Sequence, residues 1–243
     1  MIKVQNSSRT ITPFGGLNFV FTALSKLNIN SIIEKKLGFR APNAIYSYTD
    51  IVNSLFVNDL SQGSVLSDVE TLNSKLEGQN IKKLPSADTI EYVCQELKSE
   101  TIVSQNGKVT HEFNFNNKFN ESLISIALKT KQLHANTSGY TLDFDNVVIP
   151  TEKQDSKFTY KKTKGYHPNF ATIGRIPVHL ENHNGNTPAK YEQEATLGRL
   201  FKNFASENIK IKHFRGDSAS FQANVINLVE KETESFFIRN MNS

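Results

Sequence analysis

The 243-residue sequence predicts an α/β (α+β) chain, in which a helical N-terminal region precedes a mixed sheet with helices. Two observations support this class. Apolar residues recur at helical spacing through residues 1–100, whereas after Gly139 they largely alternate with polar residues, as they do in strands. The later segments follow the order strand, strand, strand, helix, strand, helix, strand, which is typical of a sheet with helical crossovers.

Residues 1–100 are expected to form a helical domain. An apolar pattern over residues 19–37 predicts a first helix. A second helix begins near Ser47 and Asp50, both of which are candidate N-terminal caps. A third follows Ser86, and the residues expected on its buried face are Ile90, Val93, Cys94 and Leu97.

Residues 101–119 are polar and turn-prone, and we expect a linker there. Phe113 and Phe115 alternate with polar residues, so one short strand within this segment is an open alternative. A second domain is expected over residues 120–243, with a hairpin turned at Gly174. Its predicted elements are a helix over 120–132, strands over 140–149, 170–173 and 176–180, a helix over 192–204, a strand over 209–214, a helix over 221–232 and a strand from 235.

Composition excludes several classes of protein. Hydrophobic residues make up 37% and charged residues 21%, which argues against wholesale disorder. No apolar run reaches the ~18 residues that a membrane-spanning helix needs, and the N-terminus lacks the apolar stretch of a secretory signal. A single cysteine, Cys94, leaves no internal disulfide and no Cys-based zinc site. We therefore expect a cytoplasmic protein with no membrane partner.

Two aspartates share one face of the first predicted strand of the second domain. Asp143 and Asp145 are two residues apart, so their side chains project from the same face. Aspartate is uncommon inside strands, and two like charges repel unless a cation or a donor lies between them. The alternative is that both are solvated residues at the end of the strand.

A third aspartate follows the fourth strand of this domain. Asp217 stands between Gly216 and Ser218, where it could simply cap the next helix. However, Asp145 and Asp217 can converge if their two strands are neighbours in the sheet. Two such carboxylates bind hard divalent cations, and a pair of Mg²⁺ ions can activate the attacking oxygen and stabilise the leaving oxygen in phosphodiester chemistry. The pattern predicts Mg²⁺ (or Mn²⁺) at Asp145 and Asp217.

A basic segment with aromatic residues follows the first strand, between residues 151 and 167. Its lysines can neutralise phosphates and its rings can stack on unpaired bases, although a solvated hairpin is an open alternative. The residues expected to contact DNA are Lys157, Lys161, Lys162, Lys164, Tyr160 and Tyr166.

These segments resemble one family in their order along the chain. LDFDNVVIP (142–150), YKKTKGYHP (160–168) and ATI (171–173) closely resemble insertion-sequence transposases of the thirteen-eighty group, which are Asp-Asp-Glu enzymes with an RNase H-like catalytic domain. The resemblance continues in ENHNGN (181–186) and RGDS (215–218), and in TPFGGL (12–17), YSY (46–48) and LPSADT (84–89). It therefore spans nearly the whole chain.

The resemblance implies an incomplete RNase H-like domain over residues 120–243 and a DNA-binding region over residues 1–100. It places the first catalytic aspartate of the family at Asp145 and the second at Asp217, with Asp143 as a substitute or helper of the first. The expected partner is DNA at the terminal repeats of the element, in a nucleoid-associated protein, and a homodimer is an open alternative.

The third acid of the family is a glutamate on a later helix, which has no counterpart in this sequence. Glu230, Glu232 and Glu234 are the acids that follow Asp217, and they lie at or just past the end of the next predicted helix. We therefore expect the front portion of a transposase, which binds Mg²⁺ weakly and catalyses little or nothing by itself.

Two other functions remain open from the sequence. A haloacid dehalogenase-like phosphatase would use Asp143 as nucleophile and Asp145 as acid/base, and GDS at 216–218 resembles the closing acidic motif of that class. A non-catalytic DNA-binding remnant would recognise element ends without cutting them.

Overall fold

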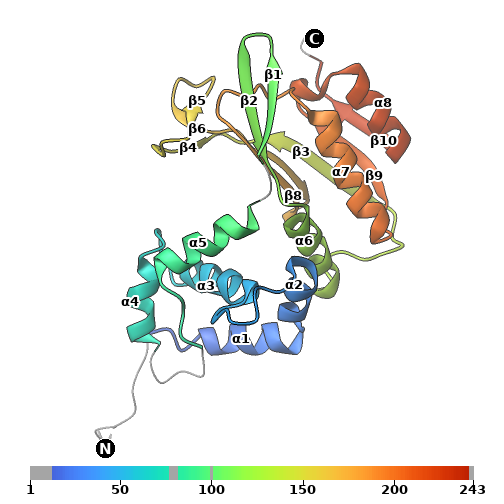
Figure 1. Cartoon of the computed structure of the whole chain (residues 1–243). Helices are drawn as coiled ribbons and strands as arrows, with labels where there is room; N and C mark the ends of the chain where they lie inside the picture. The colour runs from blue at the N-terminus through green and yellow to red at the C-terminus, as the bar shows by residue number, and fades with distance from the viewer. Residues whose placement is uncertain (1–12, 77–81, 99–100, 241–243) are drawn as a thin grey trace, which may run out of the picture. The chain divides into compact units, whose positions relative to one another are not determined.

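The computed structural model describes residues 13–76, 82–98 and 101–240, and the chain divides into two compact units, residues 1–97 and 98–243. The described residues combine helices with a mixed sheet, as the sequence predicts (Figure 1). None of the helices in these residues has the length and apolar character needed to cross a membrane.

The first unit is helical. An apolar core joins its helices, and Ile51, Val57, Val69, Ile90 and Val93 are fully buried in it. The helices are α1 (Leu17–Lys26), α2 (Ile29–Leu37), α3 (Tyr48–Leu60), α4 (Asp68–Lys75) and α5 (Ala87–Leu97).

The long first helix that the apolar pattern predicts is two helices, α1 and α2. Asn28 between them adopts a left-handed backbone with φ of 55°, which an α-helix cannot continue through. Asparagine tolerates this conformation better than most residues, so the break needs no glycine.

Of the two candidate caps of α3, Ser47 is the N-cap and Asp50 lies in the first turn, where the two residues form a capping box. The Ser47 hydroxyl accepts a hydrogen bond from the backbone N–H of Asp50 at 3.1 Å, and the Asp50 carboxylate accepts one from the backbone N–H of Ser47 at 2.8 Å. Lys82 adds an ion pair to Asp50 at 2.6 Å.

A seven-stranded mixed sheet is the centre of the second unit, in the order β1-β2-β8-β7-β3-β9-β10. β3, β9 and β10 are parallel to one another, and the other neighbouring pairs are antiparallel. The main-sheet strands are β1 (Ile102–Asn106), β2 (Val109–Asn114), β3 (Tyr140–Asn146), β7 (Asn169–Ile173), β8 (Ile176–His183), β9 (Ile211–Gly216) and β10 (Thr233–Ile238).

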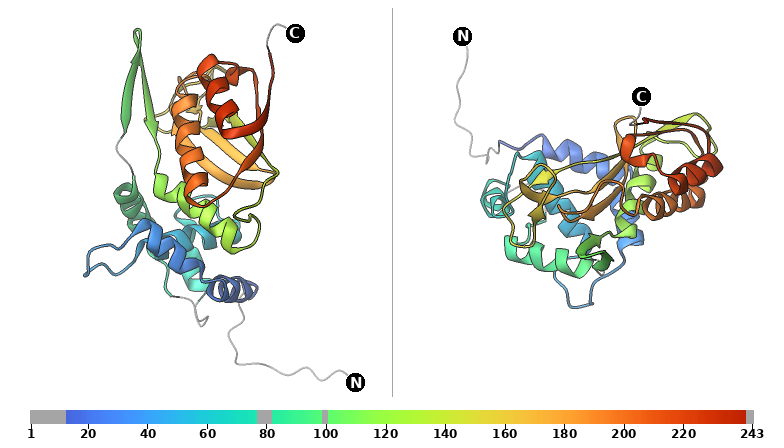
Figure 2. Two further views of the ribbon diagram at one scale, coloured as in Figure 1. Left: turned by 90° about the vertical axis from the view of Figure 1, so that its right-hand side faces the viewer. Right: turned by 90° about the horizontal axis from the view of Figure 1, so that it is seen from above.

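Three helices cover one face of this sheet: α6 (Asn117–Lys129), α7 (Gln193–Ser206) and α8 (Ala223–Glu232) (Figure 2). Sheet residues such as Leu142, Phe144 and Phe214 pack against them in one apolar core. The opposite face carries more accessible side chains, among them Leu180 and Phe237, which are 45% and 61% exposed.

Residues 101–119, for which the sequence predicts a linker, instead contain the β1–β2 hairpin. The hairpin is attached to the main sheet by the pairing of Phe113 with His183 and of Asn114 with Asn182. Beyond these pairs, Asn120 of α6 occupies the edge of β8: its side-chain amide donates to the carbonyl of Leu180 at 3.2 Å and accepts from the N–H of Leu180 at 3.0 Å. The segment therefore belongs to the second unit.

A small three-stranded sheet follows β3 directly, in the order β4-β6-β5. Gly165 in its central strand allows close approach, because a Cβ there would lie 2.4 Å from the carbonyl oxygen of Ile149. The strands are β4 (Ile149–Pro150), β5 (Lys157–Phe158) and β6 (Lys164–Tyr166).

We expect Ser47→Ala to destabilise α3 by about 1 kcal/mol, because the backbone N–H of Asp50 loses its acceptor. Native-state hydrogen exchange of the α3 amides should accelerate about fivefold. Ser67→Ala is the matched control, since Ser67 precedes α4 without a side-chain capping bond. Equal effects of the two substitutions would contradict the capping role of Ser47.

Candidate functional site

The parallel pairing of β3 with β9 brings Asp145 and Asp217 to the same end of two adjacent strands. Its register matches Asp143 with Arg215 and Phe144 with Gly216. Asp217 follows Gly216 with an extended backbone, with φ of −76° and ψ of −172°, and Asp145 follows Phe144, the residue that pairs with Gly216. Adjacent strands lie about 5 Å apart, and paired residues project from the same face. The two aspartates therefore stand one residue beyond the last β3–β9 pair, at the same end of the two strands.

Each carboxylate of this pair has one oxygen engaged by the local backbone. Oδ1 of Asp145 accepts from the N–H of Asn146 at 2.7 Å, and Oδ1 of Asp217 accepts from the N–H of Ala219 at 2.9 Å. The latter bond caps the short 3-10 helix η1 (Ser218–Ser220), so Asp217 is a capping residue as well. Both side chains are exposed, which leaves their Oδ2 atoms accessible.

The backbone between β9 and η1 has no space for a side chain at position 216. A Cβ added to Gly216 would lie 2.7 Å from the hydroxyl of Ser220 and 3.1 Å from the ring of Phe214. Glycine therefore lets the chain turn immediately beside Asp217.

The carboxylate of Asp143 is not available to bind a metal together with Asp145 and Asp217. Its Oδ1 and Oδ2 accept from Nε and Nη2 of Arg215 at 2.5 Å and 2.8 Å, a two-pronged ion pair across β3 and β9. These hydrogen bonds raise the pKa of Arg215 above its ordinary value. Both oxygens of Asp143 are engaged, which makes it the partner of Arg215.

Asp145 and Asp217 fit Mg²⁺ or Mn²⁺ as two oxygen ligands, because Mg²⁺ is usually held by one or two carboxylates together with water and substrate phosphates. Within residues 13–76, 82–98 and 101–240, no group of three or more His, Cys, Asp or Glu residues is arranged to hold a metal ion. The described residues thus offer two carboxylates at this end of β3 and β9, with no group of three.

The small sheet carries the predicted DNA-contacting residues close in sequence after Asp145. Tyr160 is 72% exposed, and Nζ of Lys161 lies 5.7 Å from the centre of its ring. Lys157, Lys161 and Lys162 are exposed, and Lys164 is half-buried. These five residues lie on β5, on β6 and in the segment that joins them, with Lys157 and Lys164 on opposite faces of the small sheet because Lys164 pairs with Phe158.

Tyr166 differs from the other predicted contact residues. Its hydroxyl donates to Oδ1 of Asp155 at 2.6 Å, and its ring is half-buried. Burial, together with this hydrogen bond, raises the pKa of Tyr166 to about 12. The hydrogen bond connects β6 to the segment between β4 and β5, which gives Tyr166 a structural role there.

A buried ionic cluster around Glu181 is a feature that sequence analysis did not identify. Glu181 in β8 is fully buried and accepts from Nε and Nη2 of Arg199 at 2.6 Å and 2.8 Å. Thr196 donates to it at 2.6 Å, and Nε2 of His179 lies 3.1 Å away. Burial raises the pKa of Glu181, but the hydrogen bonds from Arg199 and then His179 offset this effect and hold the pKa well below its ordinary value.

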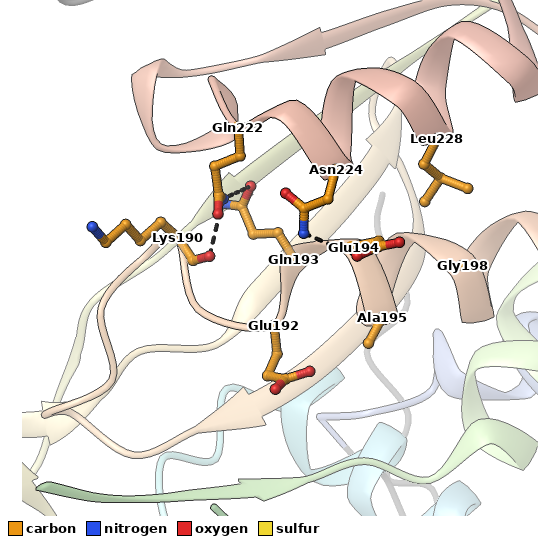
Figure 3. A pocket seen from close by; sticks show the side chains of 9 residues that line it. All are labelled: Lys190, Glu192, Gln193, Glu194, Ala195, Gly198, Gln222, Asn224 and Leu228. Carbon is orange, nitrogen blue, oxygen red and sulfur yellow. Dashed lines mark hydrogen bonds between the residues drawn. The ribbon is translucent and has the colours of Figure 1, made fainter. Parts of the chain in front are cut away.

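A pocket of about 450 Å³ lies between the beginnings of α7 and α8 (Figure 3). Its polar groups largely bond to one another: Gln222 donates to the carbonyl of Lys190 at 3.0 Å, and Asn224 donates to Glu194 at 2.9 Å. Neither Asp145 nor Asp217 lines it. The paired aspartates therefore lie outside this pocket.

Comparison with known proteins identifies no family to which the chain can be assigned. No model of a known protein family matches the chain, and no curated protein matches its sequence.

We expect Glu181→Gln to destabilise the chain by about 2–3 kcal/mol at pH 7, because the half-buried Arg199 loses the charged partner that Glu181 supplies from the buried side. Since the pKa of Glu181 is lowered by folding, its stabilising effect is complete above the ordinary glutamate pKa of about 4.3 and decreases as the pH falls below it. Urea unfolding of both proteins from pH 7 to about pH 3.5 measures this change.

Glu192→Gln is the control for this prediction, because Glu192 is exposed at the beginning of α7. It should change the free energy of unfolding by less than about 0.5 kcal/mol. A wild-type advantage over Glu181→Gln that stays constant down to about pH 3.5 would show that the charge of Glu181 is not what stabilises the fold.

Proposed function

We propose that this chain is a DNA transposase of the insertion-sequence type, related to the thirteen-eighty group, and that Asp145 and Asp217 are two of its metal-binding carboxylates. One observation supports the proposal: β3 and β9 are adjacent parallel strands, and the two aspartates stand at the same end of them, one residue beyond the last β3–β9 pair.

The order of the strands supports the same proposal. β8, β7 and β3 form an antiparallel meander, followed by β9 and β10, which are parallel to β3 and reached through α7 and α8. This order supports the RNase H-like sheet that the resemblance implies. The β1–β2 hairpin is an addition at one edge.

The residues at the site have separate tasks in this proposal. Asp145 and Asp217 hold divalent cations through their accessible oxygens, and Asp143 holds Arg215 beside them. Bound Mg²⁺ would supply activation of the attacking oxygen and stabilisation of the leaving oxygen of a phosphodiester. With two carboxylates rather than three, we expect weak metal binding and little cleavage by the described residues alone.

The small sheet is the proposed contact with the DNA backbone. Its exposed lysines follow Asp145 within twenty residues, and Tyr160 offers a ring for an unpaired base near a cut end. The proposed partner is the terminal repeat of the element, and the proposed location is the cytoplasm, at the nucleoid.

A haloacid dehalogenase-like phosphatase is disfavoured by two features. A nucleophile at position 143 would need a free carboxylate oxygen, whereas Arg215 engages both oxygens of Asp143. In addition, β3 pairs with the antiparallel β7, the next strand of the main sheet, where that class requires a helical crossover.

A non-catalytic DNA-binding protein shares the proposed fold and differs only in its lack of chemistry. An assay of cleavage of DNA that carries the element ends, in Mg²⁺, separates the two functions, and hydrolysis of a generic phosphate ester tests the phosphatase.

Titration with Mn²⁺, followed by electron paramagnetic resonance, tests the metal pair directly. We expect wild-type binding on the order of millimolar, and a loss of about tenfold or more in Asp145→Asn and in Asp217→Asn, because each change removes a charged ligand. Asp59→Asn, an exposed change in α3, should bind as the wild type does. Unchanged Mn²⁺ affinity in both site variants would refute the proposed metal site.

Replacing Lys161, Lys162 and Lys164 together with Gln should weaken DNA binding. The slope of log K against log salt should become less steep by up to about 3, since each lost phosphate contact removes about 0.9. The matched control replaces the exposed Lys190, Lys202 and Lys210 with Gln, which changes the net charge equally. An identical slope in the two triple variants would exclude the small sheet from the DNA interface.

A further inference from the structure

A chain of hydrogen bonds crosses the helix-facing side of the sheet from Glu181 to the residue after Asp145. Thr196 of α7 donates to Glu181 at 2.6 Å and accepts from the side-chain amide of Asn169 at 3.2 Å. The carbonyl oxygen of that amide accepts from the side chain of Asn146. Four polar side chains from four elements are thereby connected.

The strand registers explain why the chain ends at the candidate site. Asn146 pairs with Asn169, and Asn169 pairs with Glu181, so the three residues form one row across β3, β7 and β8. Asp145 lies in the next row. The backbone N–H of Asn146 donates to Oδ1 of Asp145, so the position of Asn146 orients this carboxylate.

Burial of the charged Glu181 carboxylate at the far end of the row costs free energy, and a purely structural role would not require a charged residue there. Replacing a buried ion pair with packed apolar residues is often neutral or stabilising, so such a pair is weak evidence of a need for stability. Here the pair also anchors Thr196, because Nη2 of Arg199 contacts the same hydroxyl at 3.3 Å. The guanidinium of Arg199 also packs on an aromatic ring: its Cζ atom lies 4.4 Å from the centre of the Phe115 ring.

We propose that Thr196 and Asn169 are positioning residues that hold the end of β3, and thereby the carboxylate of Asp145, in the orientation that a divalent cation requires. The metal in this inference rests on the proposed function. The positioning of Asn146 by Thr196 and Asn169 does not depend on it. Outer residues that orient metal ligands commonly change metal affinity by 10–100-fold.

Thr196→Val tests this proposal, because it removes the hydroxyl and keeps the shape of the side chain. We expect Mn²⁺ affinity to fall about tenfold and the backbone N–H of Asn146 to exchange with solvent faster. Thr196→Ser restores the hydroxyl and should return both quantities to within about twofold of wild type. Thr187→Val is the matched control, since Thr187 is buried and its hydroxyl has no hydrogen-bond partner among the described residues.

The outcomes separate this inference from the proposed function. A folded Thr196→Val protein with wild-type Mn²⁺ affinity and wild-type exchange at Asn146 overturns the inference. If the wild type itself binds no Mn²⁺, the proposed metal site fails, and exchange at Asn146 still decides the positioning role. If Thr196→Val does not fold, Asn146→Ala, which removes the last bond of the row, takes its place in the Mn²⁺ titration, and wild-type affinity would again overturn the inference.

Discussion

The parallel pairing of β3 with β9 is the constraint on which the candidate site depends. Parallel neighbours need a long crossover, so the chain passes through β7, β8 and α7 before it returns, and residues 217 − 145 = 72 positions apart come to the same end of adjacent strands. The buried side chains of Leu142, Phe144 and Phe214 fix this register. A slip of one residue would turn a carboxylate toward the helices, where the apolar core cannot accept it.

Much of the fold could be predicted because its signals are local. Helical and strand periods, the cap at Ser47 and the turn at Gly174, where φ is 61°, all depend on a few consecutive residues. The break at Asn28 was missed because apolar spacing continues across it. Of the β1–β2 hairpin, the sequence left open one strand at Phe113, which β2 contains, but not the pairing with β1, because its polar residues become a strand pair through attachment to β8, a partner far along the sequence.

The candidate site was predictable in part for the same reason. Asp145 and Asp217 stand at strand ends, a position that sequence periodicity can locate. The pairing of Asp143 with Arg215 depends on register across two strands, and the cluster of Glu181 depends on α7 packing over β8. Three-dimensional packing decides both, and no spacing along the sequence encodes either.

The amide of Asn120 at the edge of β8 has a consequence for association between molecules. A strand edge with free N–H and C=O groups can recruit a strand from another chain and lead to aggregation. By occupying both backbone groups of Leu180, Asn120 imitates one residue of a neighbouring strand and closes the edge where β2 ends. A shorter side chain at this position would leave the gap open to a second copy of the protein.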